Sequence, residues 1–270
     1  VGLHADGEKW ILGTDGSELL YMGAVSELSR ALKDARVYLT SYKEVLEQGR
    51  LDLLGCSEVF DIELAAYLLS PEERNYSLER IRDGLGDEIE VHRENHGQAV
   101  LAIGRLLRTR LAGSDLLGLM QSLELPLTEV LVRMQKRGIR IDEAKFRDFL
   151  SMVQAELDRL TQKIHAQAGE EFNIRSSQQL GEVLFSRLGL KSKQKTPGGA
   201  QSTSSSVLEG LAGEHPIVAD ILEFRMYEKL RSTYLEPLPQ LAGKDGRIHT
   251  TFNQLATATG RLSSSNPNLQ

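Results

Sequence analysis

The sequence predicts a mixed fold of the α+β or α/β class that continues into a mainly α-helical C-terminal half. Three observations carry this prediction. Short apolar runs open the chain and are separated by Asp-Gly dipeptides, which indicate hairpins between extended segments. From residue 60 onward, apolar residues recur at helical spacing. After residue 113 the helical segments become long, so a helical domain is expected to follow a small α/β layer.

The length and charge of the chain set its broad class. The 270 residues are 40% hydrophobic and 26% charged, which is typical of a soluble globular protein with two domains. The formal net charge of -6 argues mildly against nucleic acid as a partner, because duplex binding is driven by neutralisation of phosphates. The distribution of charge matters more, since residues 187–201 hold no acidic residue and four basic ones, Arg187, Lys191, Lys193 and Lys195.

The cysteine content and the lengths of the apolar runs indicate the cellular compartment in which the protein is expected. The single cysteine, Cys56, cannot form an intramolecular disulfide, and no Cys/His cluster has the spacing of a zinc site. The chain does not open with a signal peptide, and no apolar run approaches the roughly 18 residues of a membrane helix. We therefore expect a reducing interior and no membrane partner. The lack of an initiator methionine suggests an excised fragment.

Residues 1–112 are predicted to form the α/β domain. Extended segments are expected at 1–5, 9–12, 18–22 and 37–40, with a helix N-capped by Ser26 before the last of them. Helices are expected from Phe60 onward. Their apolar faces are formed by Leu64, Tyr67, Leu68, Leu78, Ile81, Leu85, Val100, Ile103, Leu106 and Leu107.

Residues 113–270 are predicted to be mainly helical. A first helix ends at Gly138, and its expected apolar face consists of Leu127, Val130, Leu131 and Met134. Asp142 is a good N-cap for a helix that keeps one apolar face for over five turns until Gly169. This face is formed by Phe146, Phe149, Leu150, Val153, Leu157, Leu160 and Ile164.

A helix of that length needs a partner along its apolar face. The next helix, which opens with a capping box of Ser176 and Gln179 and ends at Gly189, is the expected partner. A last helix begins at Pro216 and runs towards Tyr234. Its expected apolar stripe is Val218, Leu222 and Met226.

Three stretches have the chemistry of phosphate contacts. Residues 191–204 form a basic, Gly-containing loop that ends in Ser202, Thr203 and Ser204, although a flexible linker would have the same composition. Arg225, Lys229 and Ser232 recur at i, i+4 and i+7 on one helix face, although a solvated face explains them equally. The third stretch, at 257–270, surrounds Arg261 with short hydrogen-bonding side chains. By composition alone, it would be an ordinary loop.

Two other sets of polar residues could suggest metal ions. Asp61 and Glu63 would lie about 200° apart on a helix and could not converge on one metal. His92 and His96 stand at i and i+4 with Glu94 between them, but a third ligand is not evident. We favour surface solvation for both sets.

The run Phe252-Asn-Gln-Leu-Ala-Thr-Ala-Thr-Gly-Arg-Leu-Ser-Ser-Ser-Asn-Pro-Asn-Leu-Gln270 resembles the segment between thumb and palm in family A DNA polymerases, the bacterial DNA polymerase I group. Residues 120–142 and the helical pair after them resemble the thumb, and residues 223–234 resemble its helix that contacts the DNA backbone. The resemblance implies that residues 113–270 are thumb and start of palm. The implied DNA contacts are Ser202, Thr203, Ser204, Arg225, Lys229, Ser232, Thr257, Arg261, Asn268 and Gln270.

Residues 1–112, with Phe60–Pro71, resemble the 3′–5′ proofreading exonuclease domain of these polymerases, which has an RNase H-like fold. That activity needs four carboxylates around two metal ions. The expected first pair would fall before Val1, Lys43 stands near the third position, and residues 91–96 do not supply the fourth motif. We therefore expect an inactive, partial exonuclease-like domain that serves as a structural platform.

The resemblance implies a fragment of a DNA-directed DNA polymerase I that grips primer-template duplex during replication and repair. The parent would use dNTP substrates and Mg²⁺, whereas no cofactor and no catalytic residue are expected in this fragment, since the palm carboxylates and fingers should follow Gln270. We expect a monomer in the bacterial cytoplasm, at the nucleoid. Two alternatives stay open, namely an active 3′–5′ exonuclease and a non-catalytic helical interaction module.

Overall fold

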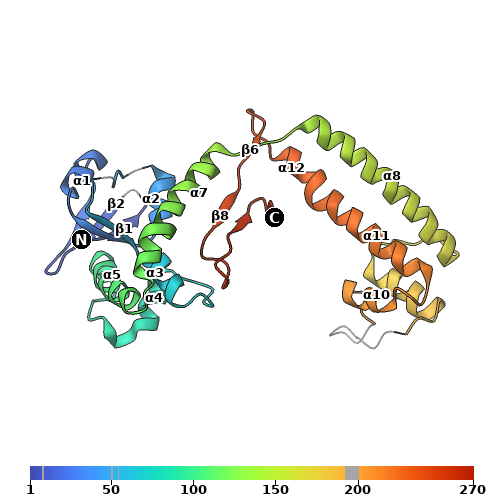
Figure 1. Ribbon diagram of the computed structural model, residues 1–270, viewed down its shortest axis with the longest axis horizontal. Coiled ribbons are helices and arrows are strands. Elements are labelled where there is room, and N and C mark those ends of the chain that lie inside the picture. Colours follow the sequence, from blue (N-terminus) through green and yellow to red (C-terminus); the bar gives the residue numbers. More distant parts are fainter. Residues whose placement is uncertain (8, 50, 54, 192–200) are drawn as a thin grey trace. The chain divides into compact units, whose positions relative to one another are not determined.

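The computed structural model describes residues 1–7, 9–49, 51–53, 55–191 and 201–270, which form two compact units (Figure 1). The first unit contains Val1–Gly138 and His249–Gln270, and the second contains Ile139–Ile248. The chain therefore divides elsewhere than at the expected boundary between residues 112 and 113. The physical reason is that the helix ending at Arg137 packs on the N-terminal elements, and the last 22 residues return to the same body.

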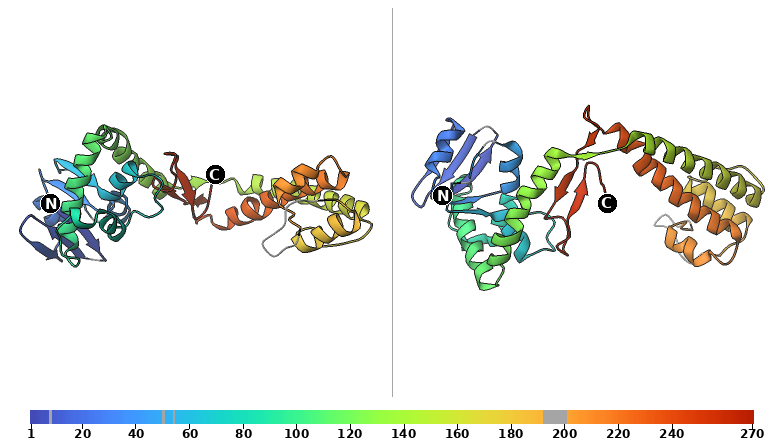
Figure 2. Two further views of the ribbon diagram at one scale, coloured as in Figure 1. Left: turned by 90° about the horizontal axis from the view of Figure 1, so that it is seen from below. Right: turned by 45° about the horizontal axis from the view of Figure 1, so that its top comes forward.

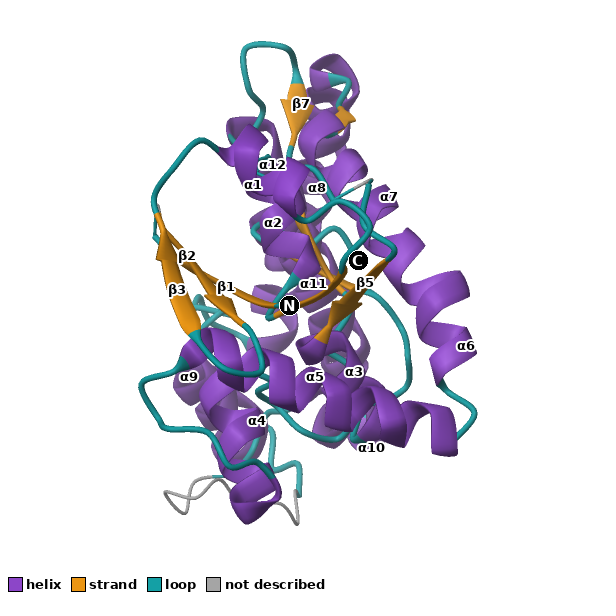
Figure 3. Cartoon of the chain, turned by 90° about the vertical axis from the view of Figure 1, so that its left-hand side faces the viewer, coloured by secondary structure: helices purple, strands orange, loops and turns teal. Residues whose placement is uncertain are grey.

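A five-stranded sheet with the order β3-β2-β1-β4-β5 organises the first unit (Figure 3). β2 pairs antiparallel with both β1 and β3, whereas the β1–β4 and β4–β5 pairs are parallel. The four extended segments predicted from the sequence are confirmed, but β5 was missed, because its residues were assigned to a helix from Phe60 onward. The strands are β1 Gly2–Asp6, β2 Lys9–Gly13, β3 Glu18–Tyr21, β4 Arg36–Leu39 and β5 Glu58–Asp61.

Helices cover both faces of this sheet. One face carries the core of Tyr38, Phe60 and helices α3 to α5, and the other carries Val37, Leu39 and helices α1 and α2. The neighbours Val37 and Tyr38 enter opposite cores because side chains alternate along a strand. The helices are α1 Val25–Ala31, α2 Tyr42–Gln48, α3 Ile62–Leu69, α4 Leu78–Leu85, η1 Gly86–Glu88, α5 His96–Gly113, α6 Leu117–Leu119, η2 Met120–Glu124 and α7 Leu125–Arg137.

Two local predictions in this unit are corrected. Helix α1 begins at Val25 after Ala24, not after Ser26, and Ala24 makes no side-chain cap. On α7 the buried residues are Thr128, Leu131 and Val132. Val130 and Met134, which were expected on the apolar face, are exposed.

Glycines let helix α5 approach the sheet closely. A Cβ built on Gly2 would lie 2.1 Å from the carbonyl oxygen of Gly97, and one on Gly13 would lie 2.1 Å from the carbonyl carbon of Gly97. No side chain fits at such distances, so these positions require glycine for packing rather than for backbone freedom.

The second unit is built on two long helices, α8 Glu143–Ala168 and α11 Pro216–Leu230, which lie side by side in both views of Figure 2. Asp142 caps α8 as predicted, accepting from the amides of Ala144 and Lys145, and Gly169 ends the helix in the left-handed conformation. The expected partner of α8 was the next helix along the chain, but the long partner is α11. The physical reason is length, because α9 and η3 span only residues 177–187.

The remaining elements of the second unit are short. An antiparallel pair, β6 and β7, joins its two ends, and Leu180, Val183 and Leu184 complete the core between the long helices. These elements are β6 Ile139–Arg140, α9 Ser177–Gly181, η3 Glu182–Arg187, α10 Ser205–Leu211, η4 Arg231–Leu235, α12 Pro237–Gln240 and β7 Arg247–Ile248.

The apolar stripes of the two long helices differ in part from the prediction. Val153, Leu157, Leu160 and Ile164 are buried as expected, but Phe149 is 44% exposed. On α11, Ile217, Val218, Ile221 and Phe224 are buried, whereas Met226 is 58% exposed. Hydrophobicity at helical spacing therefore located the stripe but not its edges. Within the described ranges, no helix is long and apolar enough to span a membrane.

Two truncations on α8 distinguish buried from exposed positions of the predicted stripe. Leu160→Ala should lower the free energy of unfolding by about 2–5 kcal/mol, because it leaves a cavity in the fully buried contact with α11. Phe149→Ala should cost less than about 1 kcal/mol, because much of this ring already contacts water. Denaturant unfolding of both variants checks this, and equal losses would contradict the burial described here.

Candidate nucleic-acid interface

The ten predicted DNA contacts fall into two groups, one in each unit. Six lie around α11 and the segment before α10, and four lie in the C-terminal segment of the first unit. Lys193 and Lys195 of the predicted basic loop lie outside the described residues, as does most of that loop. Each group is described by itself below.

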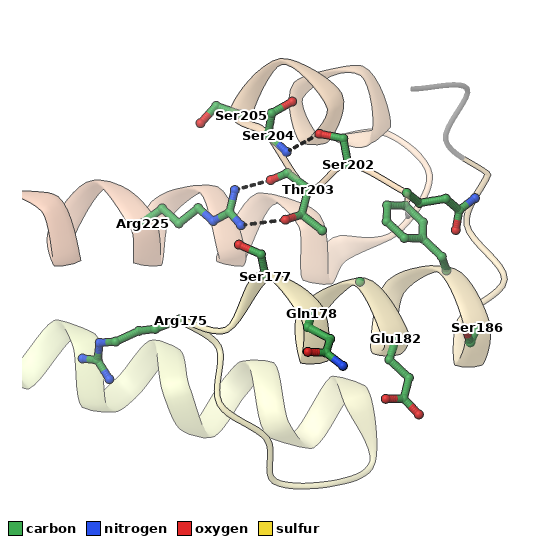
Figure 4. Close-up of a pocket in the computed structure, with 13 residues that line it drawn as sticks. Arg175, Ser177, Gln178, Glu182, Ser186, Ser202, Thr203, Ser204, Ser205 and Arg225 are labelled. Atoms are coloured by element: carbon green, nitrogen blue, oxygen red, sulfur yellow. Dashed lines mark hydrogen bonds between the residues drawn. The ribbon is translucent and has the colours of Figure 1, made fainter. Parts of the chain in front are cut away.

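Arg225 borders a cleft in the second unit (Figure 4). Its guanidinium donates from Nη1 to the carbonyl oxygen of Thr203 and from Nη2 to the Thr203 hydroxyl, the latter at 3.3 Å. Burial lowers the pKa of Arg225 from its usual value, yet arginine keeps its charge at physiological pH. Among the described residues, no carboxylate forms an ion pair with Arg225, so its positive charge is not neutralised by a neighbour.

Mainly hydroxyl and amide groups form the rest of this cleft, together with the Glu182 carboxylate, the Phe185 ring and Arg175. Thr203 is only 6% exposed, and its hydroxyl points at Arg225, as Figure 4 shows. Ser202 accepts a hydrogen bond from the amide of Ser204 at 3.2 Å, and the Ser204 side chain is exposed. Further lining residues come from α9 and η3: Ser177, Gln178, Glu182 and Ser186. A half-buried cation among hydroxyls is suited to bind an anion.

Lys229 and Ser232 continue the same side of α11 towards η4. The Lys229 side chain is exposed, and the Ser232 hydroxyl donates to the Glu228 carbonyl oxygen at 2.7 Å. The neighbouring Glu228 carboxylate does not oppose Lys229, because it binds Arg175 at 2.6 Å and Arg231 at 2.8 Å. The hydrogen bonds from Arg175 lower the pKa of Glu228 to about 2. Glu228 is thus an internal counter-ion.

The second group lies on a two-stranded ribbon, β8 Thr251–Asn253 and β9 Ser263–Ser265, and in the segments next to it. Arg261 is exposed in the connection between the strands. Thr257 stabilises this connection, since its hydroxyl donates to the Arg261 carbonyl oxygen at 2.6 Å. Tyr67 of α3 donates its hydroxyl to the Thr257 carbonyl oxygen at 2.8 Å.

Asn268 and Gln270 are exposed but take part in the local structure. The Asn268 side-chain oxygen accepts from the amide of Gln270 at 2.8 Å and from the Ser264 hydroxyl at 3.3 Å. The Gln270 side chain donates to the Leu262 carbonyl oxygen at 3.1 Å. These bonds bring Asn268, Gln270 and the connection that carries Arg261 onto one small structure.

A buried polar pair anchors the ribbon to α7. Gln254 accepts from the Thr128 hydroxyl at 2.8 Å and donates to the Glu124 carbonyl oxygen at 3.1 Å. Both Thr128 and Gln254 are buried. The sequence analysis did not identify them, and no local pattern could have done so, because the partners are 126 positions apart.

Asp61, one of the residues considered as possible metal ligands, has a structural role in the fold. Asp61 ends β5 and is 4% exposed, and it accepts from the amides of Tyr42 at 2.7 Å and Leu64 at 2.9 Å. The prediction of surface solvation is therefore wrong for Asp61, which caps α3. Burial raises the pKa of Asp61 to about 6, and burial together with the Asp61 charge raises that of Glu63 to about 8.

The histidine pair does not form a helical i, i+4 site. His92 lies in a loop and is exposed, while His96 begins α5 and stacks on His4 with ring centroids 5.1 Å apart. In the part of the chain that the structure describes, no group of three His, Cys, Asp or Glu residues is arranged to hold a metal ion. Lys43 donates to the Phe252 carbonyl oxygen at 2.5 Å.

The chain is similar to known polymerases along most of its length. Residues 143–270 match the family described as DNA polymerase family A. The chain is 46% identical over 213 residues to the thermostable DNA polymerase I of Thermus thermophilus, covering 77% of this chain and 25% of that protein. It is 40% identical over 270 residues to that of Thermus filiformis, covering 94% of this chain and 32% of that protein.

A solved structure extends the similarity to the fold. The POL domain of Pol1 from M. smegmatis, in complex with DNA primer-template and dNTP, superposes with a TM-score of 0.81 at 28% sequence identity. The match covers 99% of this chain and 51% of that chain. The present chain spans about a quarter to a third of the length of the curated relatives named above. The family match, the identity over most of the sequence and the common fold show that this chain belongs to DNA polymerase family A.

Proposed function

We propose that this chain grips primer-template DNA for a DNA polymerase I during replication and repair. The observation that carries the proposal is the Arg225 guanidinium, a half-buried cation without a carboxylate partner among the described residues, in a cleft lined by hydroxyls. Such a group attracts a phosphate. The similar M. smegmatis structure, a complex with DNA primer-template and dNTP, supports this assignment.

In this proposal the second unit is the polymerase thumb and binds the DNA backbone. Arg225 and Lys229 neutralise phosphates, and Ser202 and Ser204 donate hydrogen bonds to phosphate oxygens. Ser232 would donate to a phosphate after its hydroxyl turns away from the Glu228 carbonyl oxygen. Thr203 has a different role from the predicted direct contact, since its buried hydroxyl holds Arg225 in place. Contacts of this kind provide affinity and register without reading the base sequence.

The C-terminal ribbon would supply the contacts to the primer end. Arg261 reaches the minor groove, while Asn268, Gln270 and Thr257 hold primer and template. The exposure of Arg261, Asn268 and Gln270, and the hydrogen bond by which Thr257 holds the connection that carries Arg261, support this assignment. Short amide and hydroxyl side chains suit a minor-groove floor, which presents mainly hydrogen-bond acceptors.

The parent protein is proposed to be a DNA-directed DNA polymerase that uses dNTPs and acts as a monomer in the bacterial cytoplasm, at the nucleoid. Mg²⁺ would supply charge stabilisation for phosphoryl transfer in that enzyme. Asp61 is a poor fit for such an ion, because both of its carboxylate oxygens already accept backbone hydrogen bonds.

The N-terminal part is proposed to be a partial exonuclease-like domain of the RNase H type that serves as a platform. A mixed five-stranded sheet with helices on both faces is compatible with that fold. Lys43 places an ammonium group next to the cavity that Asp61 and Glu63 line, where it would repel a metal ion. This arrangement favours the platform over the alternative of an active nuclease.

Removal of the two cations on α11 tests the thumb assignment. Arg225→Ala/Lys229→Ala should weaken binding of a primer-template duplex and lower the slope of log affinity against log salt by about two, because two phosphate contacts are lost. Fluorescence anisotropy over a salt series measures both. The matched control is Arg30→Ala/Lys33→Ala, on α1 and in the turn that follows it, which removes the same charge and should leave the slope unchanged. Equal slopes for the two double variants would refute the assignment.

The raised pKa of Glu63 makes the stability of the chain dependent on pH. Since its pKa is about 8 in the folded chain and near 4.5 when unfolded, the folded state holds the extra proton in between. Its contribution to stability is complete below about pH 4.5 and is lost as the pH rises through about 8. We expect Glu63→Gln to flatten this decline in thermal unfolding.

The same measurement tests the nuclease alternative. A metal ion bound by Asp61 and Glu63 would hold both carboxylates ionised, so MgCl₂ would raise the melting temperature of the unaltered chain at pH 8. We expect no such rise, and no Mg²⁺-dependent release of mononucleotides from single-stranded DNA. A rise that Glu63→Gln abolishes would support the nuclease.

A further inference from the structure

Side chains from two helices form hydrogen bonds with the peptide groups on either side of Phe252. The Nζ of Lys43, on α2, donates to the Phe252 carbonyl oxygen at 2.5 Å. The side-chain oxygen of Gln135, on α7, accepts from the Phe252 amide at 2.8 Å. Phe252 lies in β8, one strand of a two-stranded ribbon, so one edge of this strand has no strand neighbour. The two side chains satisfy edge groups that would otherwise need another strand or water.

Glu47 connects the two gripping side chains. Gln135 donates from Nε2 to Glu47 Oε1 at 2.6 Å, and Lys43 Nζ lies 3.6 Å from the same oxygen. The carboxylate can only accept, so it directs the NH₂ group of Gln135 towards itself and leaves the amide oxygen for the Phe252 N–H. The three residues thus form a closed network around one backbone position, which we call the Phe252 clamp (Lys43, Glu47, Gln135).

The clamp acts where the ribbon most needs support. A two-stranded ribbon is marginally stable by itself, and β8 and β9 have three residues each. Among the described residues, its other attachments include Gln254 on α7 and Thr257 on Tyr67, both further along the chain than Phe252. Before β8, the His249 ring Nδ1 lies 2.7 Å from the Gln135 carbonyl oxygen of α7. The clamp is therefore the attachment in β8 itself, before the connection that carries Arg261.

We propose that Lys43, Glu47 and Gln135 are positioning residues for DNA binding, which hold β8 on the N-terminal body and so present Arg261, Asn268 and Gln270 to the primer-template. This inference rests on the DNA-binding function proposed above. It gives the N-terminal domain a specific task in that function. Lys43 acts through the Phe252 peptide and does not contact DNA.

The experiment compares Lys43→Met with Lys136→Met. Lys136 lies on α7 and donates to the Leu46 carbonyl oxygen of α2 at 2.7 Å, so it joins the same helices without touching the ribbon. Both substitutions remove one positive charge. Hydrogen–deuterium exchange of peptides covering residues 250–254 should accelerate in Lys43→Met, whereas Lys136→Met should exchange like the unaltered chain. Lys43→Arg, which keeps a donor, should restore part of the protection.

Binding of primer-template DNA supplies the second readout. Lys43→Met should raise Kd about tenfold, the effect of losing one charge-assisted hydrogen bond, without changing the salt slope. An unchanged slope separates positioning from a direct phosphate contact, which would lower the slope by about one. Gln135→Met, which removes the other half of the clamp, should show the same pattern and serves if Lys43→Met does not fold.

Each outcome of these measurements either supports or overturns the positioning role of the clamp. Faster exchange with weaker binding and an unchanged slope supports the clamp, whereas unchanged exchange in a folded Lys43→Met or Gln135→Met overturns it. A slope lowered by about one overturns it too, because Lys43 would then contact DNA. Arg261→Ala is measured in parallel to test the proposed function. Suppose that Arg261→Ala weakens binding, while Lys43→Met accelerates exchange at residues 250–254 but leaves binding unchanged. The clamp then has no positioning role. If Arg261→Ala also leaves binding unchanged, the inference fails because the DNA-binding function of the ribbon has failed.

Discussion

The return of residues 249–270 to the N-terminal unit is the constraint on which the position of the C-terminal ribbon depends. This segment contributes little to the apolar core, since Leu255 is its one described residue packed against a core cluster. Its attachment is made by side chains that bind backbone or amide groups, such as Tyr67, Thr128 and Lys43. Such bonds are directional, so they define position better than apolar contact does. A defined position is what the proposed contacts of this segment with a DNA end require.

The second unit is held together mainly by apolar packing between its helices. Its long helices α8 and α11 bury a continuous apolar stripe, and the almost fully buried Asp220 of α11 is bound by Lys163 and Gln167 of α8. This rigid pair holds Arg225 at the cleft, while Arg175 and Arg231 neutralise Glu228 on the same helix. Arg225 and Lys229 thus have no carboxylate partner among the described residues, which supports the proposal that they contact phosphates.

The sequence predicted the elements better than their partners. Asp-Gly turns located the first strands, and Asp142 and Gly169 marked the ends of α8. The periodicity of apolar residues could not predict that α8 would pair with α11. It identifies which face of a helix is buried, but not which element covers that face. The resemblance to family A polymerases indicated Arg225 and Arg261 as candidates. The bonds that hold them, from Thr203 and within the ribbon, became visible only in three dimensions, since Lys43 and Phe252 are 209 positions apart.

Hydrogen–deuterium exchange with and without DNA tests most directly the proposal that each of the two groups of residues contacts primer-template DNA. Bound duplex should slow exchange in peptides covering residues 201–206, 225–232 and 257–270, and leave β3 and α1 at the edge of the first unit unaffected. Single-stranded DNA of the same length should protect less. If the exchange rates of these peptides are the same with and without duplex, under conditions in which fluorescence anisotropy reports binding, the proposed interface is contradicted.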